Sequence, residues 1–341
     1  MRPPRGLTPC AVAMVSIIAV GAVGAALPLG GSTGARQNDR SSFKVIGYYS
    51  LRAATTADPA SVPFNQLTHV NLSFLNPTPA GEYTQNLAAL ATFVAAAHAS
   101  GVKVLASIGG GGDHSYYHAL LADDRRPAFI DRLVGLAVEH QLDGIDVDLE
   151  GGDIGASYEP FVLELGQALR RHGKLMTSAI AVFYKDQLTD RALAQYDFVN
   201  IMSYDHTGPW RPERPGPHST FEHAVEALEY FGATRKIPRE RMVLGVPFYG
   251  YGYGPEPSSP AVTMTYKDIV ATFPGADQAD EWKMPGGKTI YYNGIPTIRR
   301  KTGLAMEKAS GIMIWQILGD AANDLSLLGA INEMAYGTRA R

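Results

Sequence analysis

The stretch Asp143–Gly151 reads Asp-Gly-Ile-Asp-Val-Asp-Leu-Glu-Gly and places carboxylates in a segment that otherwise has the pattern of a buried strand. Because side chains alternate between the two faces of a strand, Asp146, Asp148 and Glu150 share one face and the aliphatic residues share the other. Same-face neighbours lie about 7 Å apart. Like charges this close in a partly dry site do not all ionise, so the pattern predicts that at least one carboxyl keeps its proton near neutral pH, as a general acid does.

Two other interpretations fit an acidic segment of this kind. A calcium-binding EF-hand loop would spread its oxygen ligands around a glycine turn, whereas Ile145, Val147 and Leu149 interleave here as in a strand. A magnesium site at a strand end is the stronger alternative, since carboxylates in that position also bind hard cations. No second acidic strand end occurs in the sequence. We therefore expect neither a metal ion nor another cofactor.

Short β-like runs alternate with amphipathic helical stretches along the chain, which indicates βα units and a parallel sheet. Eight runs have strand character, the number of a (β/α)8 barrel. The runs are Lys44–Ser50, Thr68–Phe74, Lys103–Ile108, Gly144–Glu150, Leu175–Val182, Phe198–Tyr204, Met242–Phe248 and Gly311–Ile317. The stretches with helical spacing are Leu87–Ala99, Pro127–Gln141, Tyr158–Arg171, Phe221–Phe231 and Ile298–Lys308. The sequence predicts an α/β fold, a TIM barrel over residues 41–337.

One connection is longer than the others. The segment Tyr251–Ile295, between the seventh strand and its helix, is rich in Gly, Pro, Ser and Tyr. Long loops at the carboxyl face of a barrel are usually functional. Tyr266–Phe273 has the pattern of a short helix and Thr289–Tyr292 that of a strand, so we expect a short insertion beside the site.

The N-terminus has the layout of a secretory signal, with basic residues in Met1–Arg5 and an apolar run at Ala11–Leu29. Small residues follow directly, which favours cleavage after Ala26 or Ala35 and predicts a signal peptide over residues 1–35. An uncleaved anchor is the alternative, because the run is about long enough to cross a bilayer. We expect a secreted, extracellular protein without stable membrane association.

Composition limits the partners. The formal net charge is −3 and the sequence contains no long basic run, which argues against nucleic acid or an anionic membrane surface and favours a neutral substrate. The only cysteine, Cys10, precedes the apolar run, so the mature chain is expected to contain no disulfide.

Polar and aromatic residues gather at the predicted carboxyl ends of the strands, where a barrel carries its chemistry. In chain order they are Tyr48-Tyr49, Ser73-Phe74, Ser107-Ile108-Gly109-Gly110, the acidic segment, Met202-Ser203-Tyr204-Asp205, Phe248-Tyr249 and Trp315-Gln316. Taken together, this set resembles glycoside hydrolase family 18, the chitinases and their relatives, over about residues 44–336.

The resemblance implies a role for each residue. Glu150 would be the general acid and later the base, Asp148 would orient the substrate's acetamido group, and Asp146 would hold Asp148. Asp143 would instead fix the loop at the start of the strand. The resemblance also implies an acetamido contact from Tyr204 and sugar contacts from Asp205, Trp315, Tyr48, Phe74 and Tyr249. For the last three, packing in the barrel core remains an equal alternative.

Carboxylates that project from one strand reach the cleaved bond from one side, so none is placed to attack the anomeric carbon from the opposite face. The resemblance implies that the substrate's own 2-acetamido oxygen attacks, and hence a monomeric, secreted chitinase that cuts β-1,4 bonds between N-acetylglucosamine units with retention. An endo-β-N-acetylglucosaminidase acting on the chitobiose core of N-glycans and a non-catalytic chitin-binding lectin are the alternatives.

The chain departs from many larger chitinases on both sides of the acid. Those proteins have Trp before it and Tyr-Pro after it, whereas Leu149 and Gly151-Gly152 stand here. A contact on the leaving-group side is therefore missing or comes from elsewhere in the chain.

Overall fold

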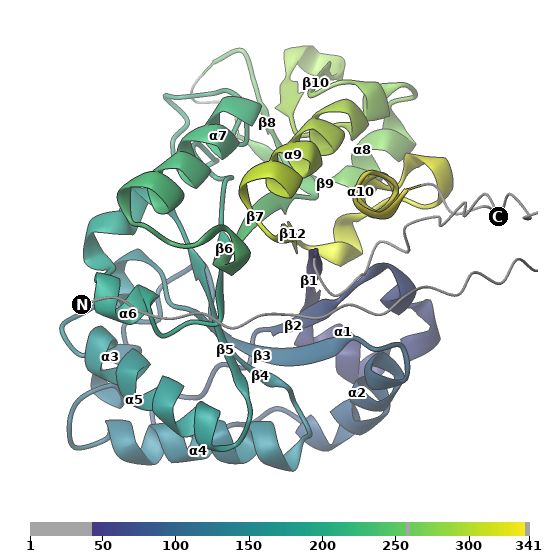
Figure 1. Ribbon diagram of the computed structural model, residues 1–341. Coiled ribbons are helices and arrows are strands. Elements are labelled where there is room, and N and C mark those ends of the chain that lie inside the picture. Colours follow the sequence, from purple (N-terminus) through teal and green to yellow (C-terminus); the bar gives the residue numbers. More distant parts are fainter. Residues whose placement is uncertain (1–42, 257–259, 338–341) are drawn as a thin grey trace, which may run out of the picture. The chain divides into compact units, whose positions relative to one another are not determined.

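The computed structural model describes residues 43–256 and 260–337 (Figure 1). Within them, eight parallel strands close into a barrel in the ring order β1-β2-β3-β4-β5-β6-β7-β12, so the predicted TIM barrel is confirmed. The predicted signal peptide and Cys10 lie outside the described residues. The strands are β1 (Lys44–Ser50), β2 (His69–Ser73), β3 (Lys103–Gly109), β4 (Gly144–Asp148), β5 (Leu175–Ile180), β6 (Phe198–Ile201), β7 (Met242–Pro247) and β12 (Gly311–Trp315).

Four predicted strands extend two or three residues too far at their carboxyl ends, namely those that correspond to β4, β5, β6 and β12. The fourth strand shows the reason. Its pairing with β3 ends at Asp148, yet Glu150 keeps an extended backbone with φ −120° and ψ 145°. The side chains therefore continue to alternate after the hydrogen-bonded ladder has stopped, and a sequence pattern records only the alternation.

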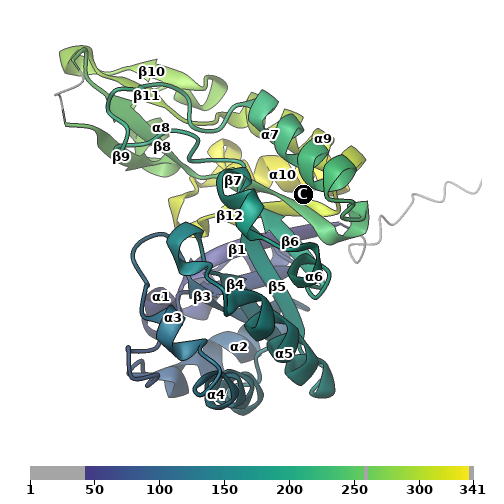
Figure 2. The ribbon, with the colours of Figure 1, turned by 90° about the vertical axis from the view of Figure 1, so that its left-hand side faces the viewer.

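Helices surround the barrel (Figures 1 and 2). The helix Tyr158–Arg171, α5, has both of its predicted ends: Phe161, Leu165 and Leu169 form its fully buried stripe, and Gly173, with φ +64°, ends the helical backbone. The other helices around the barrel are α1 (Leu51–Thr56), α2 (Leu90–Ala99), α3 (Tyr117–Leu120), α4 (Arg126–Glu139), α6 (Asp190–Leu193), α7 (Phe221–Glu229), α9 (Ile295–Lys308) and α10 (Leu327–Tyr336).

The insertion between β7 and α9 is a small α+β layer. Its strands form an antiparallel sheet in the order β10-β11-β8-β9, grouped next to α8 in Figure 2. The elements are β8 (Tyr249–Tyr253), β9 (Val262–Thr265), α8 (Tyr266–Thr272), β10 (Glu281–Lys283) and β11 (Thr289–Tyr291). The sequence predicted α8 and β11 but missed the other three strands.

The strand β8 was missed because it alternates tyrosine with glycine, a residue that weakens strand patterns. Its glycines have a packing reason. A Cβ on Gly250 would lie 2.5 Å from the Tyr291 carbonyl oxygen, and one on Gly252 would lie 2.7 Å from a methyl group of Val262. The alternation therefore gives β8 a bare face against the rest of the insertion and places its tyrosines together on the other face.

A buried lysine ties three parts of the chain together beside the barrel. Lys301 of α9 is fully buried, and its ammonium donates to the Ser219 carbonyl oxygen at 2.8 Å, to Ser219 Oγ at 2.7 Å and to Asn293 Oδ1 at 2.8 Å. Ser219 Oγ in turn donates to the Ser203 carbonyl oxygen at 2.6 Å. Burial lowers the pKa of Lys301 to about 7. The helix α9, the end of the insertion and the end of the β6–α7 loop are thus joined through one side chain.

We expect Lys301→Met to lower the free energy of unfolding by about 1–3 kcal/mol, because the buried oxygens of Ser219 and Asn293 lose their donor. Urea denaturation followed by circular dichroism measures the change. Lys308→Met, which removes an exposed ion pair with Glu229, serves as the control and should cost less than about 1 kcal/mol. A Lys301→Met protein as stable as the wild type would contradict this role.

Candidate functional site

Asp146 lies at the centre of the barrel and is held by donors from four strands. Its Oδ2 accepts hydrogen bonds from Tyr48 Oη at 2.5 Å and from Ser107 Oγ at 2.7 Å. Its Oδ1 accepts from Thr177 Oγ1 at 2.5 Å and from Asn200 Nδ2 at 3.4 Å. Burial raises the pKa of Asp146, while these four hydrogen bonds act in the opposite direction. The carboxylate is therefore fixed and has little capacity for a further partner.

Asp148 and Glu150 follow on the same strand face, nearer the carboxyl rim. Asp148 is 3% exposed, and its Oδ1 has no hydrogen-bond partner among the described residues. Burial, followed by the charges of Glu150 and Asp146, holds the pKa of Asp148 well above its usual range. Burial, followed by the charges of Asp205 and Asp153, raises the pKa of Glu150 to about 7. The site therefore retains protons at neutral pH, and Glu150 is poised to give one up.

Tyr204 and Asp205 extend from the end of β6 towards these acids. The only hydrogen bond of the Tyr204 hydroxyl within the described residues is a weak contact of 3.8 Å to Met313 Sδ. Asp205 has φ +60°, and its Oδ1 accepts from Tyr249 Oη at 2.5 Å and from Tyr251 Oη at 3.1 Å. The ring of His218 lies 3.2 Å from the same oxygen. Sequence reasoning missed Tyr251 and His218, although the alternation in β8 could have placed Tyr251 beside Tyr249.

An aromatic cluster stands across the site. The rings of Phe74 and Trp315 stack with centroids 5.5 Å apart and planes at 23°, and the Tyr48 ring meets Trp315 edge-on at 5.3 Å. Trp315 and Phe74 are partly exposed, whereas Tyr48 is 1% exposed. Trp315 and Phe74 are thus accessible to a ligand, and Tyr48 supports them from the core.

A cleft of about 1140 Å³ brings most of the predicted residues together: Phe74, Asp148, Glu150, Tyr204, Asp205 and Trp315 all line it. The other three, Tyr48, Asp146 and Tyr249, are absent from its lining. Tyr48 binds Asp146 and Tyr249 binds Asp205, so the two tyrosines position lining residues or their support from behind.

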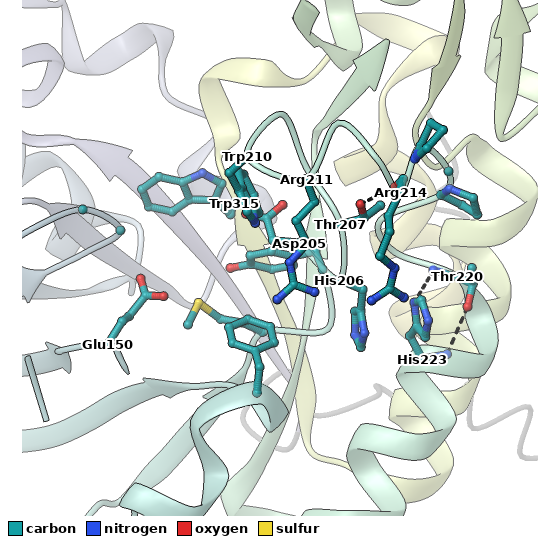
Figure 3. Close-up of a pocket in the computed structure, with 18 of the residues that line it drawn as sticks. Glu150, Asp205, His206, Thr207, Trp210, Arg211, Arg214, Thr220, His223 and Trp315 are labelled. Carbon is teal, nitrogen blue, oxygen red and sulfur yellow. Dashed lines mark hydrogen bonds between the residues drawn. The ribbon is translucent and has the colours of Figure 1, made fainter. Parts of the chain in front are cut away.

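The β6–α7 connection and the start of α7 form another wall of the cleft, and sequence reasoning missed the part of this wall that follows Asp205. Figure 3 shows its labelled side chains at a distance from Glu150. Trp210, 57% exposed, stands in this wall. The other lining residues of the segment are His206, Thr207, Arg211, Glu213, Arg214, Pro215, Gly216, Pro217, Thr220 and His223. An exposed tryptophan among prolines and glycines in a long connection was the available signal.

The turn after Glu150 leaves space beside the acid. A Cβ on Gly151 or Gly152 would meet no atom within 4 Å. The next residue, Asp153, is 3% exposed, and its amide donates to the Glu150 carbonyl oxygen at 2.9 Å. His114 Nδ1 lies 3.5 Å from Asp153 Oδ2. The glycines thus form an open turn, and the buried carboxyl of Asp153 follows it.

Asp143 lies at the start of β4, where its Oδ2 accepts from the Val104 amide at 2.7 Å and lies 2.8 Å from His98 Nε2. In the described part of the chain, no group of three or more His, Cys, Asp or Glu side chains is arranged to hold a metal ion. No helix among the described residues is long and apolar enough to span a membrane.

We expect Asp153→Asn to lower the pKa of Glu150 below about 7, because the substitution removes a negative charge that raises it. Carbon-13 NMR titration of the glutamate carboxyls measures the pKa, with the Glu150 signal assigned through Glu150→Gln. Asp131→Asn, an exposed change on α4, is the control and should leave it unchanged. If Glu150 titrates alike in both variants, Asp153 does not act on it.

Several known proteins are similar to this chain. Residues 44–320 match the family described as glycosyl hydrolases family 18. The crystal structure of the GH18 chitinase ChiB from Flavobacterium johnsoniae has a TM-score of 0.77 and 32% identity, covering 86% of this chain and 94% of that one. The class V chitinase CHIT5 of Lotus japonicus is 26% identical over 76% of this chain and 78% of its own length. A chitinase-like effector of Moniliophthora perniciosa is 28% identical over 76% of this chain and 69% of its own length.

Proposed function

Because the chain belongs to glycosyl hydrolases family 18, we propose that it is a secreted, monomeric chitinase that hydrolyses β-1,4 bonds between N-acetylglucosamine units. One observation carries the proposal. Glu150, a carboxyl whose pKa is raised to about 7, shares one cleft with Asp148, Tyr204 and Trp315. A general acid works best when its pKa lies near the working pH.

The hydrogen-bond partners of Asp146 and Asp148 give these two acids different roles. Asp146 is saturated by four donors and serves as a fixed support. Asp148 keeps one oxygen without a partner, and this oxygen is available to the N–H of a substrate acetamido group. The Tyr204 hydroxyl, bound only weakly to a sulfur, is free to donate to the carbonyl oxygen of the same group. The acetamido group is thereby held from two sides.

The chemistry follows from this one-sided arrangement. The acetamido oxygen attacks the anomeric carbon while Glu150 gives its proton to the leaving oxygen, so the glycosidic bond breaks and a cyclised sugar forms. Glu150, now ionised, takes a proton from the water that opens this ring, and the product keeps its original anomeric configuration. The faces of Trp315 and Phe74 provide the floor for the sugar. Trp210, exposed in the same cleft, offers a second stacking surface.

The two alternatives differ in observable ways. An endo-β-N-acetylglucosaminidase would release glycans from a high-mannose glycoprotein, and a lectin would bind chitin oligosaccharides without cutting them. The effector of Moniliophthora perniciosa, called chitinase-like, keeps the second alternative in view, whereas the retained Glu150 favours hydrolysis. Assay of the purified protein on N-acetylglucosamine oligomers and on a high-mannose glycoprotein separates all three functions.

We expect Glu150→Gln to reduce the rate of hydrolysis of N-acetylglucosamine oligomers about 10²–10⁴-fold, because the amide keeps the shape of the side chain but has no proton to transfer. Oligomer binding, measured by calorimetry, should persist. Glu139→Gln, an exposed change on α4, is the matched control. A Glu150→Gln protein with most of the wild-type rate would remove Glu150 from its role.

The acetamido mechanism makes a separate prediction. Asp148→Asn should reduce the rate about 10²-fold or more, because the nucleophile is no longer oriented or supported as charge develops. A thiazoline mimic of the cyclised sugar should inhibit competitively, and fully deacetylated oligomers should not be cut. NMR of the first product formed gives its anomeric configuration. Inversion, or equal cleavage of acetylated and deacetylated oligomers, would overturn the mechanism.

A further inference from the structure

The part of the cleft away from Glu150 contains a concentration of basic side chains that hydrolysis does not use. Arg211, Arg214, His206 and His223 all line it, and we call these four residues the basic arm. In Figure 3 the side chains of Arg211 and Arg214 extend in the same direction and reach the level of the His206 and His223 rings. Glu150 lies on the other side of the view from the two histidines. Both arginines are exposed.

The guanidinium groups of the basic arm are unpaired. Neither Arg211 nor Arg214 forms a side-chain hydrogen bond or an ion pair with any of the described residues, in contrast to Arg126 and Arg235, each of which binds a carboxylate. One carboxylate, Glu213, lies between the two arginines in sequence and also lines the cleft. It forms no ion pair with either of them within the part of the chain that the structure describes. Both guanidinium forks are therefore available to a ligand.

The histidines add donors without adding charge. The rings of His206 and His223 stack 3.6 Å apart at 7°. Burial lowers the pKa of His206 to about 4, helped by His223 and Lys301, and burial likewise lowers the pKa of His223. Both rings are thus neutral at pH 7. His223 Nδ1 accepts from the Thr220 amide at 3.4 Å, which leaves its Nε2 as an N–H donor.

We infer that the basic arm binds a carboxylate carried by a sugar beyond the one held at Glu150. This inference rests on the proposed function, since it concerns the same cleft. A polymer of N-acetylglucosamine alone is neutral and has no group that matches two unpaired guanidinium forks, whereas a carboxylate accepts both bonds of such a fork. The substrate class is therefore a glycan that contains N-acetylglucosamine units and also bears a carboxylate on a sugar beyond the one held at Glu150, either as a uronic acid or as an acidic ether substituent.

The exposed Trp210 supports this inference. It lines the cleft together with Glu150 and with the arginines, and sugar rings stack on exposed indoles. A chain bound across the cleft would therefore have an aromatic surface as well as the arm's charges. Two carboxylates, Asp205 and Glu213, line the cleft in the same connection. Asp205 accepts hydrogen bonds from two tyrosine hydroxyls, whereas both guanidinium groups keep their donors free for an anionic group.

Binding to the full-length Glu150→Gln protein, in which turnover is suppressed, tests the inference. Three tetrasaccharides are compared by calorimetry at low and at high salt: a neutral one of N-acetylglucosamine, one from hyaluronan with uronic acids, and one from bacterial peptidoglycan with lactyl ether carboxylates. We expect at least one acidic probe to bind roughly tenfold more tightly than the neutral one at low salt, with the gain shrinking at high salt. The probe that gains identifies the source of the carboxylate.

The variants decide whether the arm is responsible. Adding Arg211→Gln and Arg214→Gln should bring the ratio of acidic to neutral affinity close to one, whereas Arg171→Gln, an exposed arginine on α5, should keep the gain. Equal binding of all three probes, or a gain that survives the double arginine change, would overturn the inference. Failure of the wild-type protein to cut the neutral oligomer would instead count against the proposed function, and the two results are read separately.

Discussion

The saturation of Asp146 by hydroxyl and amide donors is the constraint on which the rest of the site depends. A carboxylate at the centre of a barrel can stay buried only if its oxygens are occupied, and β1, β3, β5 and β6 each supply a donor. The strand that carries Asp146 is thereby fixed in register against its neighbours. Asp148 and Glu150 follow at intervals of two residues, so their positions are set by the same bonds.

From this centre to the cleft, the surroundings of the acids change gradually. Asp146 is fully satisfied, Asp148 has one oxygen without a partner, and Glu150 reaches the cleft. Burial raises the pKa of all three, but only at Asp146 do four hydrogen bonds act against it. Carboxyls of ordinary chemistry are thus given different protonation behaviour by the depth at which a single strand places them.

The sequence was sufficient to predict the eight strands, the acidic face and the lining residues at the strand ends, because each depends on alternation within a short segment. It was insufficient for the β6–α7 wall and for β8, β9 and β10. The position of Arg211 or Trp210 depends on how a long loop folds back over the rim, and nothing local in the sequence determines that path. The roles of Tyr48 and Tyr249 likewise became clear only when their partners, Asp146 and Asp205, were located.

The β6–α7 loop is fastened at both of its ends. Asp205 is held by two tyrosines of the insertion at one end, and Ser219 is held by Lys301 at the other. The residues between these anchors can therefore be exchanged without disturbing the acidic strand. This arrangement makes the loop a region in which ligand preference can evolve, or be redesigned, independently of the strand that carries the acids.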